Sequence, residues 1–225
     1  MVSAHRASGV MNDKKYEALR GMPMNVARWM TKDPVVVESK DTLAAVRLMM
    51  NKGSFHRVPV VDGGKLVGIV SDRDLRQHTG TLSRIKVNGA MTTSVVSVTP
   101  TTMLEEAANL LVKHKIGALP VVDQGKLVGI ITATDLLRAF AEVLGTTEEG
   151  VARIDLSLEG DGSELATVAQ LVAEENGEIL GMGTYRDEPR EGRGTVIYIR
   201  LRSADANRVA RMLTDKNFTV LTVHP

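Results

Sequence analysis

Two stretches of this sequence, residues 59–69 (PVVDGGKLVGI) and residues 120–130 (PVVDQGKLVGI), are nearly identical and lie 61 positions apart. A long self-match at a fixed period is typical of a repeated structural unit. The first two thirds of the chain are therefore predicted to hold two copies of one fold. The same register, without a gap, aligns Met30-Thr31 with Met91-Thr92, Leu43 with Leu104, and Asp74-Leu75 with Asp135-Leu136.

Each copy shows the pattern of a strand, a helix, a hairpin and a second helix. A β-branched run over residues 35–37 favours a strand, and so do Val95-Val96 and then Val98 in the second copy. Apolar residues at helical spacing follow, starting at Leu43 and at Leu104. Strands over residues 58–61 and 66–70 are separated by Asp-Gly-Gly, which predicts a tight turn. Because a unit of about 60 residues buries little apolar area alone, we expect the two copies to pack together.

This pattern resembles the CBS domain, which occurs as tandem pairs called Bateman modules. The shared features are Met-Thr, a valine-rich strand, a helix, Pro-Val-Val-Asp, Lys-Leu-Val-Gly-Ile and Ser/Thr-x-x-Asp. The resemblance places repeat 1 at residues 22–84 and repeat 2 at residues 85–145. It implies a regulatory protein that binds an adenosine nucleotide (AMP, ADP, ATP or S-adenosylmethionine) in the cleft between the repeats.

The ligand signature of that family, Gly-hydrophobic-x-Ser/Thr-x-x-Asp, matches GIVSDRD ending at Asp74 and GIITATD ending at Asp135. The carboxylates can accept hydrogen bonds from ribose hydroxyls. Ser71 and Thr132 precede a predicted helix, where a hydroxyl can help to orient phosphate. The same spacing is also typical of a helix N-cap. Both roles remain open for these four residues.

The repeats differ just before the second strand, where repeat 1 has His56-Arg57 and repeat 2 has Gly117-Ala118. Arginine suits bidentate recognition of phosphate, and the pair resembles the phosphate contacts of CBS proteins such as the gamma subunit of AMP-activated kinase. A solvated basic turn is the alternative, and Arg73 could pair locally. We predict one better phosphate-binding cleft rather than two equal ones. The candidate nucleotide-binding residues are His56, Arg57, Pro59, Ser71, Arg73, Asp74, Ala118, Pro120, Thr132 and Asp135.

Composition argues against several other functions. With 28 Lys and Arg against 27 Asp and Glu, the net charge of +1 gives no general attraction to nucleic acid or to a membrane surface. Cysteine is absent, and the five histidines lack metal-ligand spacing. No G-x-x-x-x-G-K-[ST] loop or G-x-S-x-G motif occurs. We therefore expect a protein that is not an enzyme, with no metal site and no cofactor beyond a regulatory nucleotide.

The ends of the first region are polar. Residues 1–21 read as a polar N-terminal tail without the apolar centre of a signal peptide. No apolar run reaches the roughly 20 residues that a membrane helix needs. These features, with the lack of cysteine, favour a cytoplasmic protein. Residues 146–150 have the composition of a linker.

The remaining region, residues 151–225, predicts the order βαββαβ. Alternation over residues 152–158 favours a strand in an antiparallel sheet. A helix, a hairpin, a second helix and a last strand follow. This order resembles the ACT domain, a ferredoxin-like regulatory fold, and implies a possible ligand turn at Asp161, Gly162 and Ser163. The predicted fold class is thus mixed α/β (α+β), a tandem CBS pair followed by an ACT-like domain.

The whole arrangement resembles the AcuB-type acetoin-utilisation proteins of bacteria. We expect a homodimer, because a CBS pair leaves helical faces available and ACT sheets often join edge to edge, and we expect an unidentified regulated protein as a partner. Two other hypotheses remain. The chain could be a ligand-free dimerisation scaffold, or an accessory protein of acetoin catabolism.

Overall fold

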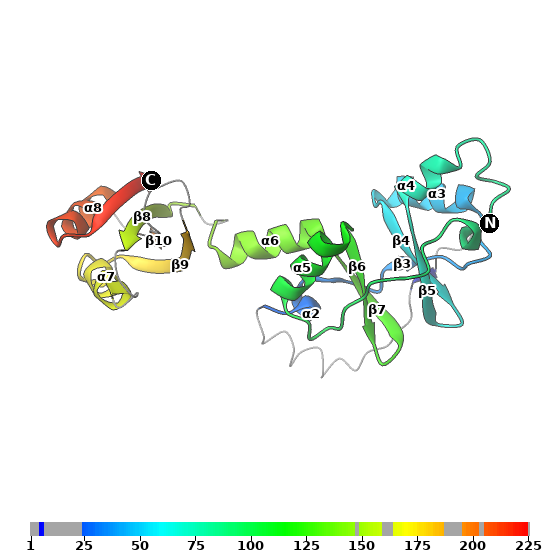
Figure 1. The fold of residues 1–225 in the computed structure, drawn as a ribbon, viewed down its shortest axis with the longest axis horizontal. Helices are drawn as coiled ribbons and strands as arrows, with labels where there is room; N and C mark the ends of the chain where they lie inside the picture. The colour runs from blue at the N-terminus through cyan, green and yellow to red at the C-terminus, as the bar shows by residue number, and fades with distance from the viewer. Residues whose placement is uncertain are drawn as a thin grey trace. The chain divides into compact units, whose positions relative to one another are not determined.

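The computed structural model describes residues 5–6, 24–146, 149–158, 164–186, 195–202 and 205–224. The chain forms two compact units, residues 1–137 and 138–225, whose elements are shown in Figure 1. The point of division lies within helix α6 (Ala133–Val143). Helices and antiparallel sheets occur in both units, so the predicted mixed α/β class is confirmed.

The first unit contains both repeats. The predicted order of strand, helix, hairpin and helix is confirmed in repeat 1. In repeat 2, residues 95–97 are irregular, and only Val98 forms a bridge, to Val121. The elements preceding β3 are β1 (His5–Arg6), α2 (Val26–Trp29) and β2 (Thr31–Lys32). Those of repeat 1 are β3 (Val35–Val36), α3 (Leu43–Gly53), β4 (Arg57–Asp62), β5 (Lys65–Ser71) and α4 (Asp72–Gln77). Those of repeat 2 are the 3₁₀ helix η1 (Val87–Gly89), α5 (Leu104–His114), β6 (Ala118–Asp123), β7 (Lys126–Thr132) and α6.

The two hairpins close through the tight turns that the sequence predicts. Gly63 and Gly64 have φ angles of 57° and 80°, and Gln124 and Gly125 have 49° and 78°. Positive φ at both central residues is the type I′ geometry, whose twist matches that of the flanking strands. The turns therefore hold β4 against β5 and β6 against β7 in the same register.

The opening segment of each repeat packs on the other repeat. The Leu104 N–H donates to the Met24 carbonyl at 2.9 Å, and the equivalent Leu43 N–H donates to the Ile85 carbonyl at 3.0 Å. Strand β2 then pairs with β7, and Thr92 bridges to β5 in the same way. The sheet of each repeat is thus extended by a segment from the other repeat. This exchange is a stronger reason for the repeats to pair than their small size alone.

This exchange explains a glycine in each copy of the Lys-Leu-Val-Gly-Ile motif. A Cβ at Gly68 would lie 2.5 Å from Sδ of Met91, and a Cβ at Gly129 would lie 2.4 Å from Sδ of Met30. Atoms cannot approach this closely without a shift. The methionine of each Met-Thr pair therefore packs over the glycine of the opposite repeat.

The cores of the repeats follow the predicted periodicity. Leu43 and Leu104, at equivalent positions on α3 and α5, are both fully buried. A smaller cluster joins Val36 to Leu127 of the other repeat, together with Val61 and Leu66. Burial of these apolar side chains stabilises each repeat and the contact between them. The repeat 1 core consists of Val37, Leu43, Val46, Met50, Val58, Val60, Val70, Leu75 and Val87.

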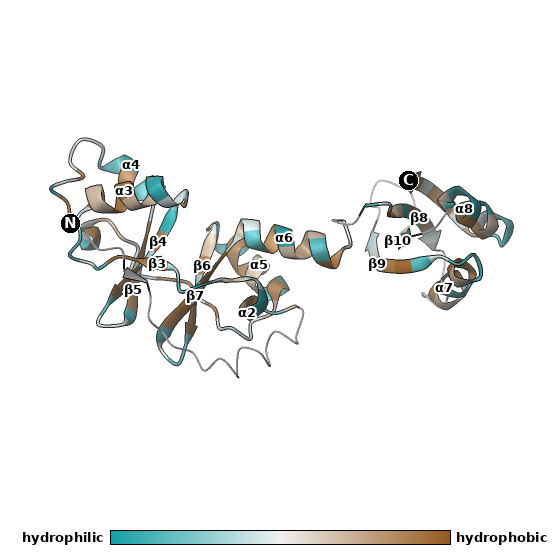
Figure 2. Ribbon diagram, turned by 180° about the vertical axis from the view of Figure 1, so that it is seen from behind, coloured by the Kyte–Doolittle hydropathy of each residue, from teal (hydrophilic) through white to brown (hydrophobic). Residues whose placement is uncertain are grey.

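The second unit has the predicted βαββαβ order, with an antiparallel sheet in the order β11-β8-β10-β9. This is the split βαβ arrangement of ferredoxin-like folds. Figure 2 shows that α8 carries both hydrophilic and hydrophobic residues, and its buried side chains join the core. The elements are β8 (Ala152–Leu158), α7 (Glu164–Glu174), β9 (Glu178–Arg186), β10 (Thr195–Arg202), α8 (Ala206–Asp215) and β11 (Thr219–His224).

The opposite face of this sheet carries a polar cluster around Asp155. Asp155 is only 6% exposed; it accepts a hydrogen bond from Arg153 Nε at 2.6 Å and one from the Tyr185 hydroxyl at 3.3 Å. The hydrogen bond to Asp155 raises the pKa of Arg153, whose guanidinium also lies 4.8 Å from the centre of the Tyr198 ring. The predicted ligand turn at Asp161, Gly162 and Ser163 lies outside the described residues.

None of the helices in the described ranges is long and apolar enough to cross a membrane.

Candidate functional site

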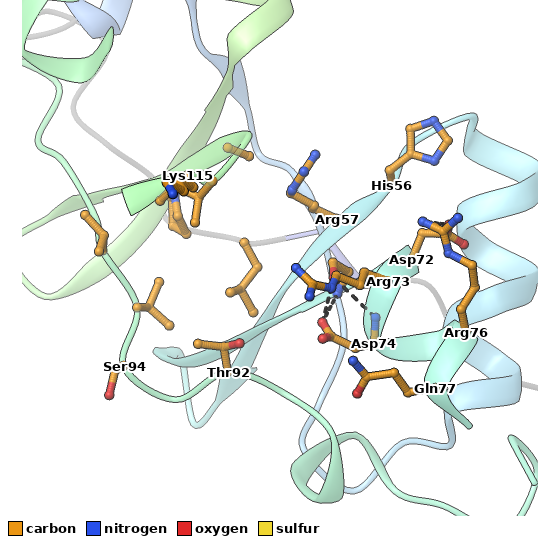
Figure 3. Close-up of a pocket in the computed structure, with 17 residues that line it drawn as sticks. His56, Arg57, Asp72, Arg73, Asp74, Arg76, Gln77, Thr92, Ser94 and Lys115 are labelled. Atoms are coloured by element: carbon orange, nitrogen blue, oxygen red, sulfur yellow. Dashed lines mark hydrogen bonds and ion pairs between the residues drawn. The ribbon is translucent and has the colours of Figure 1, made fainter. Parts of the chain in front are cut away.

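A pocket of about 720 Å³ lies between the two repeats of the first unit. Repeat 1 lines it through β4, β5 and α4, and repeat 2 lines it through the segment after Met91, the end of α5 and β6. Figure 3 shows Thr92, Ser94 and Lys115 across from Asp72 and Arg76. The lining residues are His56, Arg57, Ile69, Ser71, Asp72, Arg73, Asp74, Arg76, Gln77, Thr92, Ser94, Val95, Val96, Lys115, Ile116, Ala118 and Pro120.

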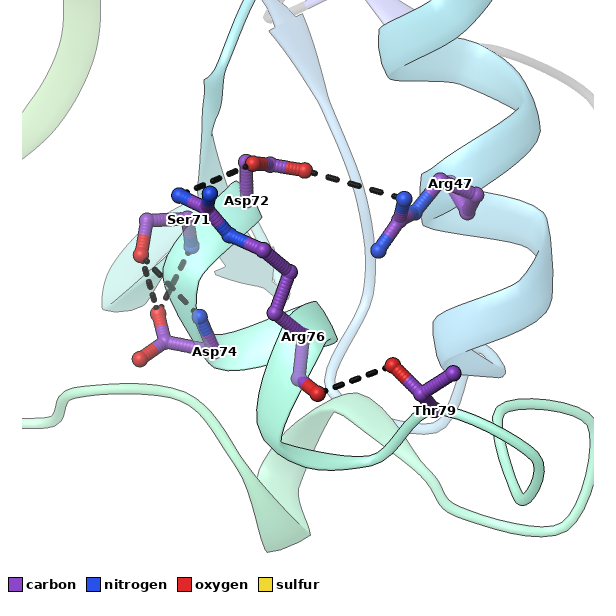
Figure 4. Close-up of polar contacts among 6 residues, drawn as sticks. All are labelled: Arg47, Ser71, Asp72, Asp74, Arg76 and Thr79. Atoms are coloured by element: carbon purple, nitrogen blue, oxygen red, sulfur yellow. Dashed lines mark hydrogen bonds and ion pairs between the residues drawn. The ribbon is translucent and has the colours of Figure 1, made fainter.

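Ser71 and Asp74 form a reciprocal cap at the start of α4 (Figure 4). Oδ2 of Asp74 accepts from the Ser71 hydroxyl at 2.7 Å and from the Ser71 N–H at 2.8 Å. The Asp74 N–H donates back to Ser71 Oγ at 3.4 Å. The predicted capping role is therefore confirmed. Both hydrogen bonds that the Asp74 carboxylate accepts from Ser71 use Oδ2. The cap therefore leaves the second carboxylate oxygen, Oδ1, for another donor in the pocket.

Thr132 and Asp135 repeat this arrangement at the start of α6. Oδ2 of Asp135 accepts from the Thr132 hydroxyl at 2.6 Å and from the Thr132 N–H at 2.9 Å. These two residues, and Pro59, do not line the pocket described above. The structure therefore separates the ten candidate residues into seven that share one pocket and three that lie elsewhere.

The pocket has an excess of positive charge. Four cationic side chains and two carboxylates line it. One carboxylate, Asp72, is already bound: it lies 3.2 Å from Arg76 and 3.8 Å from Arg47. Within the described residues, Arg57, Arg73 and Lys115 form no ion pair, so the predicted alternative of a local partner for Arg73 finds no support there. These three cations face the same space as the free side of Asp74.

The seven predicted residues in the pocket are His56, Arg57, Ser71, Arg73, Asp74, Ala118 and Pro120. Figure 3 shows the His56 ring turned away from Thr92 and Lys115. Sequence reasoning missed Thr92, Ser94 and Lys115. Thr92 belongs to the Met-Thr pair of repeat 2, and the sequence pattern does not indicate that this pair lines a pocket with residues of repeat 1. Lys115 takes a left-handed conformation, with φ of 51°, at the end of α5, and no motif marked it.

Apolar side chains form another part of the lining. Ile69, Val95, Val96, Ile116 and Pro120 offer a nonpolar surface beside the cations. Small-molecule sites usually combine apolar walls with convergent polar groups. This pocket has both, although most of its lining side chains are polar or charged. Over the described part of the chain, no group of three His, Cys, Asp or Glu residues could hold a metal ion.

Comparison with known proteins identifies the repeats. The model of the CBS domain matches residues 26–79 and 85–142. The CBS domain-containing protein YhcV of Bacillus subtilis is 36% identical over 110 residues, which are 48% of this chain and 79% of that protein.

Two further proteins bear on function. A crystal structure from Vibrio cholerae, of a protein whose proposed role is acetoin utilization (AcuB), is 37% identical with a TM-score of 0.51 and covers 56% of this chain and 96% of that one. An inosine-5'-monophosphate dehydrogenase of Korarchaeum cryptofilum is 31% identical over 129 residues, but these are only 27% of the enzyme. Because YhcV is matched over 79% of its length at 36% identity, the chain belongs to the CBS-domain proteins.

Proposed function

We propose that this chain is a regulatory sensor that binds an adenosine nucleotide in the pocket between its CBS repeats. The observation that carries this proposal is the meeting, in one pocket, of Asp74 with three cations that have no acidic partner in the described residues. The volume of about 720 Å³ lies within the range of ligand pockets, about 300–1,000 Å³. Nucleotide binding is also what the resemblance to CBS pairs implies.

Each part of a nucleotide has a matching surface in the pocket. Oδ1 of Asp74 would accept a hydrogen bond from a ribose hydroxyl, while Oδ2 keeps its cap. Arg57, Arg73 and Lys115 would bind phosphate oxygens through charge-assisted hydrogen bonds. The apolar lining residues, which include Ile69, Val95 and Pro120, would cover the adenine ring. A single ligand would thus contact both repeats at once.

A contact to both repeats gives binding a way to act at a distance. If the nucleotide binds better to one arrangement of the repeats, it shifts the population toward that arrangement. The second unit, whose ferredoxin-like order fits an ACT-like domain, would transmit this shift or hold a second copy of the chain. We propose a regulatory rather than a catalytic role; the Ser71 hydroxyl, which belongs to the copy of the signature that lines the pocket, is bound within the cap.

The similarity to AcuB supports a link to acetoin utilisation, in which this chain would regulate a protein partner. A homodimer in the cytoplasm is part of the same proposal. The competing hypothesis is a dimerisation scaffold whose clefts bind no ligand.

Isothermal titration of the full chain with AMP, ADP, ATP and S-adenosylmethionine tests the proposal. The matched variants are Asp74→Asn and Asp135→Asn, which alter the same capping contact in the two repeats. We expect the first to weaken binding about tenfold or more and the second to leave it unchanged, because only Asp74 lines the described pocket. Equal loss in both variants would place the ligand elsewhere. No binding of any of the four ligands would favour the scaffold.

A further inference from the structure

The guanidinium of Arg57 lies directly over the backbone of Gly117. A Cβ at Gly117 would lie 2.6 Å from Nη2, 2.8 Å from Cζ and 2.9 Å from Nη1 of Arg57. Gly117 stands at the position of repeat 2 that His56 occupies in repeat 1. The glycine thus provides the space that the side chain from the other repeat uses.

The backbone at Gly117 does not itself require glycine. Gly63 and Gly125 have φ angles in the left-handed range, whereas the φ angle of Gly117 lies outside it. An alanine could therefore adopt the same backbone conformation. The three atoms nearest to such a Cβ all belong to the far end of the Arg57 side chain, which can swing aside. The lack of a side chain at position 117 therefore matters for where the Arg57 guanidinium lies, more than for the local fold.

The position of this guanidinium matters because of the charges around it. Arg57 comes from repeat 1, and the neighbouring wall of the pocket carries Lys115 from repeat 2. Arg73 adds a third cation, while Asp72 is held by Arg76 and Arg47. Holding like charges in one pocket is unfavourable without an anion between them. The pocket is therefore complementary to a ligand that carries several negative charges.

We infer that Gly117 is a positioning residue for Arg57, and that the pocket selects adenosine ligands by their phosphate charge. This inference rests on the proposed nucleotide site. AMP, ADP and ATP bring two or more negative charges to the cations. S-adenosylmethionine contains two positive groups, a sulfonium and an ammonium, and a single carboxylate. Its net charge is therefore positive, and the cations of the pocket repel it. Adenosine, which has no phosphate, gains nothing from the cations.

Titration calorimetry with AMP, ADP, S-adenosylmethionine and adenosine tests the inference on four forms of the full chain: the natural one, Arg57→Ala, Gly117→Ala and the double variant. We expect Arg57→Ala to weaken AMP binding about tenfold to a hundredfold, and Gly117→Ala about threefold to tenfold. In the double variant, the alanine at position 117 should have no further effect, because the side chain that it displaces is gone. Adenosine binding should not change in any variant.

A second glycine provides the control. A Cβ at Gly89 would meet only Cγ2 of Ile85, at an ordinary 3.6 Å, and Gly89 does not line the pocket. Gly89→Ala should therefore leave AMP affinity unchanged, and thermal melts should show that Gly117→Ala is folded.

The outcomes separate the inference from the proposed function. S-adenosylmethionine or adenosine binding as tightly as AMP would overturn the charge selection but keep an adenosine site. Independent, additive effects of Arg57→Ala and Gly117→Ala would overturn the positioning role. If the natural chain binds none of the four ligands, both the site and the inference are wrong.

Discussion

The two CBS repeats make the same contacts with each other but present different side chains to their clefts. Leu43 and Leu104 donate equivalent backbone hydrogen bonds to the opposite repeat, and Gly68 and Gly129 each lie against a methionine from it. At the start of β4 and of β6, by contrast, His56-Arg57 is replaced by Gly117-Ala118.

This difference shows which positions the pairing constrains. A residue that packs across the boundary between the repeats has an equivalent residue in the other repeat that meets the same steric limits, so both repeats carry the same residue type there. A residue that faces the pocket has no such limit, and one copy can carry the charge while the other provides space for it. Arg57 over Gly117 is the clearest case.

The first prediction tests the shared packing, and it has the largest expected effect. Leu43→Ala and Leu104→Ala each remove a fully buried side chain at equivalent positions, so each should lower the free energy of unfolding by about 2–5 kcal/mol. Urea unfolding followed by circular dichroism measures both. A loss in only one variant would mean that the two repeats do not depend on each other as the exchanged segments indicate.

The second prediction concerns the methionines that cross between repeats. Gly68→Val should cost about 1–3 kcal/mol, because the added atoms would overlap Met91. Adding Met91→Ala should recover part of that stability, whereas adding Met30→Ala should not, since Met30 lies over Gly129 of the other repeat. The midpoint of urea unfolding reports each variant. Equal recovery by both methionine changes would contradict the pairing.

Much of the fold follows from local sequence signals. The period of 61 residues, the Asp-Gly-Gly turn and the apolar stripe from Leu43 predict the units, because each signal acts through neighbouring residues. The exchange of opening segments could not be predicted. Thr31 pairs with Ile130, and nothing in a short polar segment says which of two nearly identical sheets it will join.

The candidate site was predictable in the same limited way. Ser71, Asp74 and Arg57 were found through a motif and through a difference between the repeats. Lys115 was not, because it lies at the end of a helix where a lysine is common and its place in the pocket depends on tertiary packing. Asp135 and Asp74 end the same motif, so the sequence predicts the same binding role for both, although only Asp74 lines the described pocket.

The third prediction separates capping from binding. Ser71→Ala and Thr132→Ala each remove the hydroxyl of an equivalent cap, so both should lower stability by about 0.5–2 kcal/mol. Only Ser71 lines the described pocket, so only Ser71→Ala should also weaken AMP binding. Thermal melts and calorimetry on the same two proteins give both quantities. A weaker AMP affinity in Thr132→Ala would show that the clefts are more alike than the structure indicates.

The smallest effect concerns Asp62, at the end of β4. The Ser39 hydroxyl and the Ser39 N–H, the latter 3.0 Å from Oδ1, lower the pKa of Asp62 below its ordinary value of 3.8. A carboxyl group whose pKa is lower in the folded state stabilises the fold above its unfolded pKa, and this contribution is lost as the pH falls through the folded pKa. Asp62→Asn should therefore lower the melting temperature slightly at neutral pH and have no such effect in strong acid.

Repeat 2 supplies the comparison for this contact. Pro100 stands where repeat 1 has Ser39, and Asp123 stands where it has Asp62. Because proline has no N–H and no hydroxyl, that position cannot donate to the carboxylate. Melting curves of Asp62→Asn and Asp123→Asn between neutral and acidic pH should therefore differ, with the Ser39 contribution present in the first alone. Identical pH dependence in both variants would show that the Ser39 contact is not what stabilises the Asp62 carboxylate.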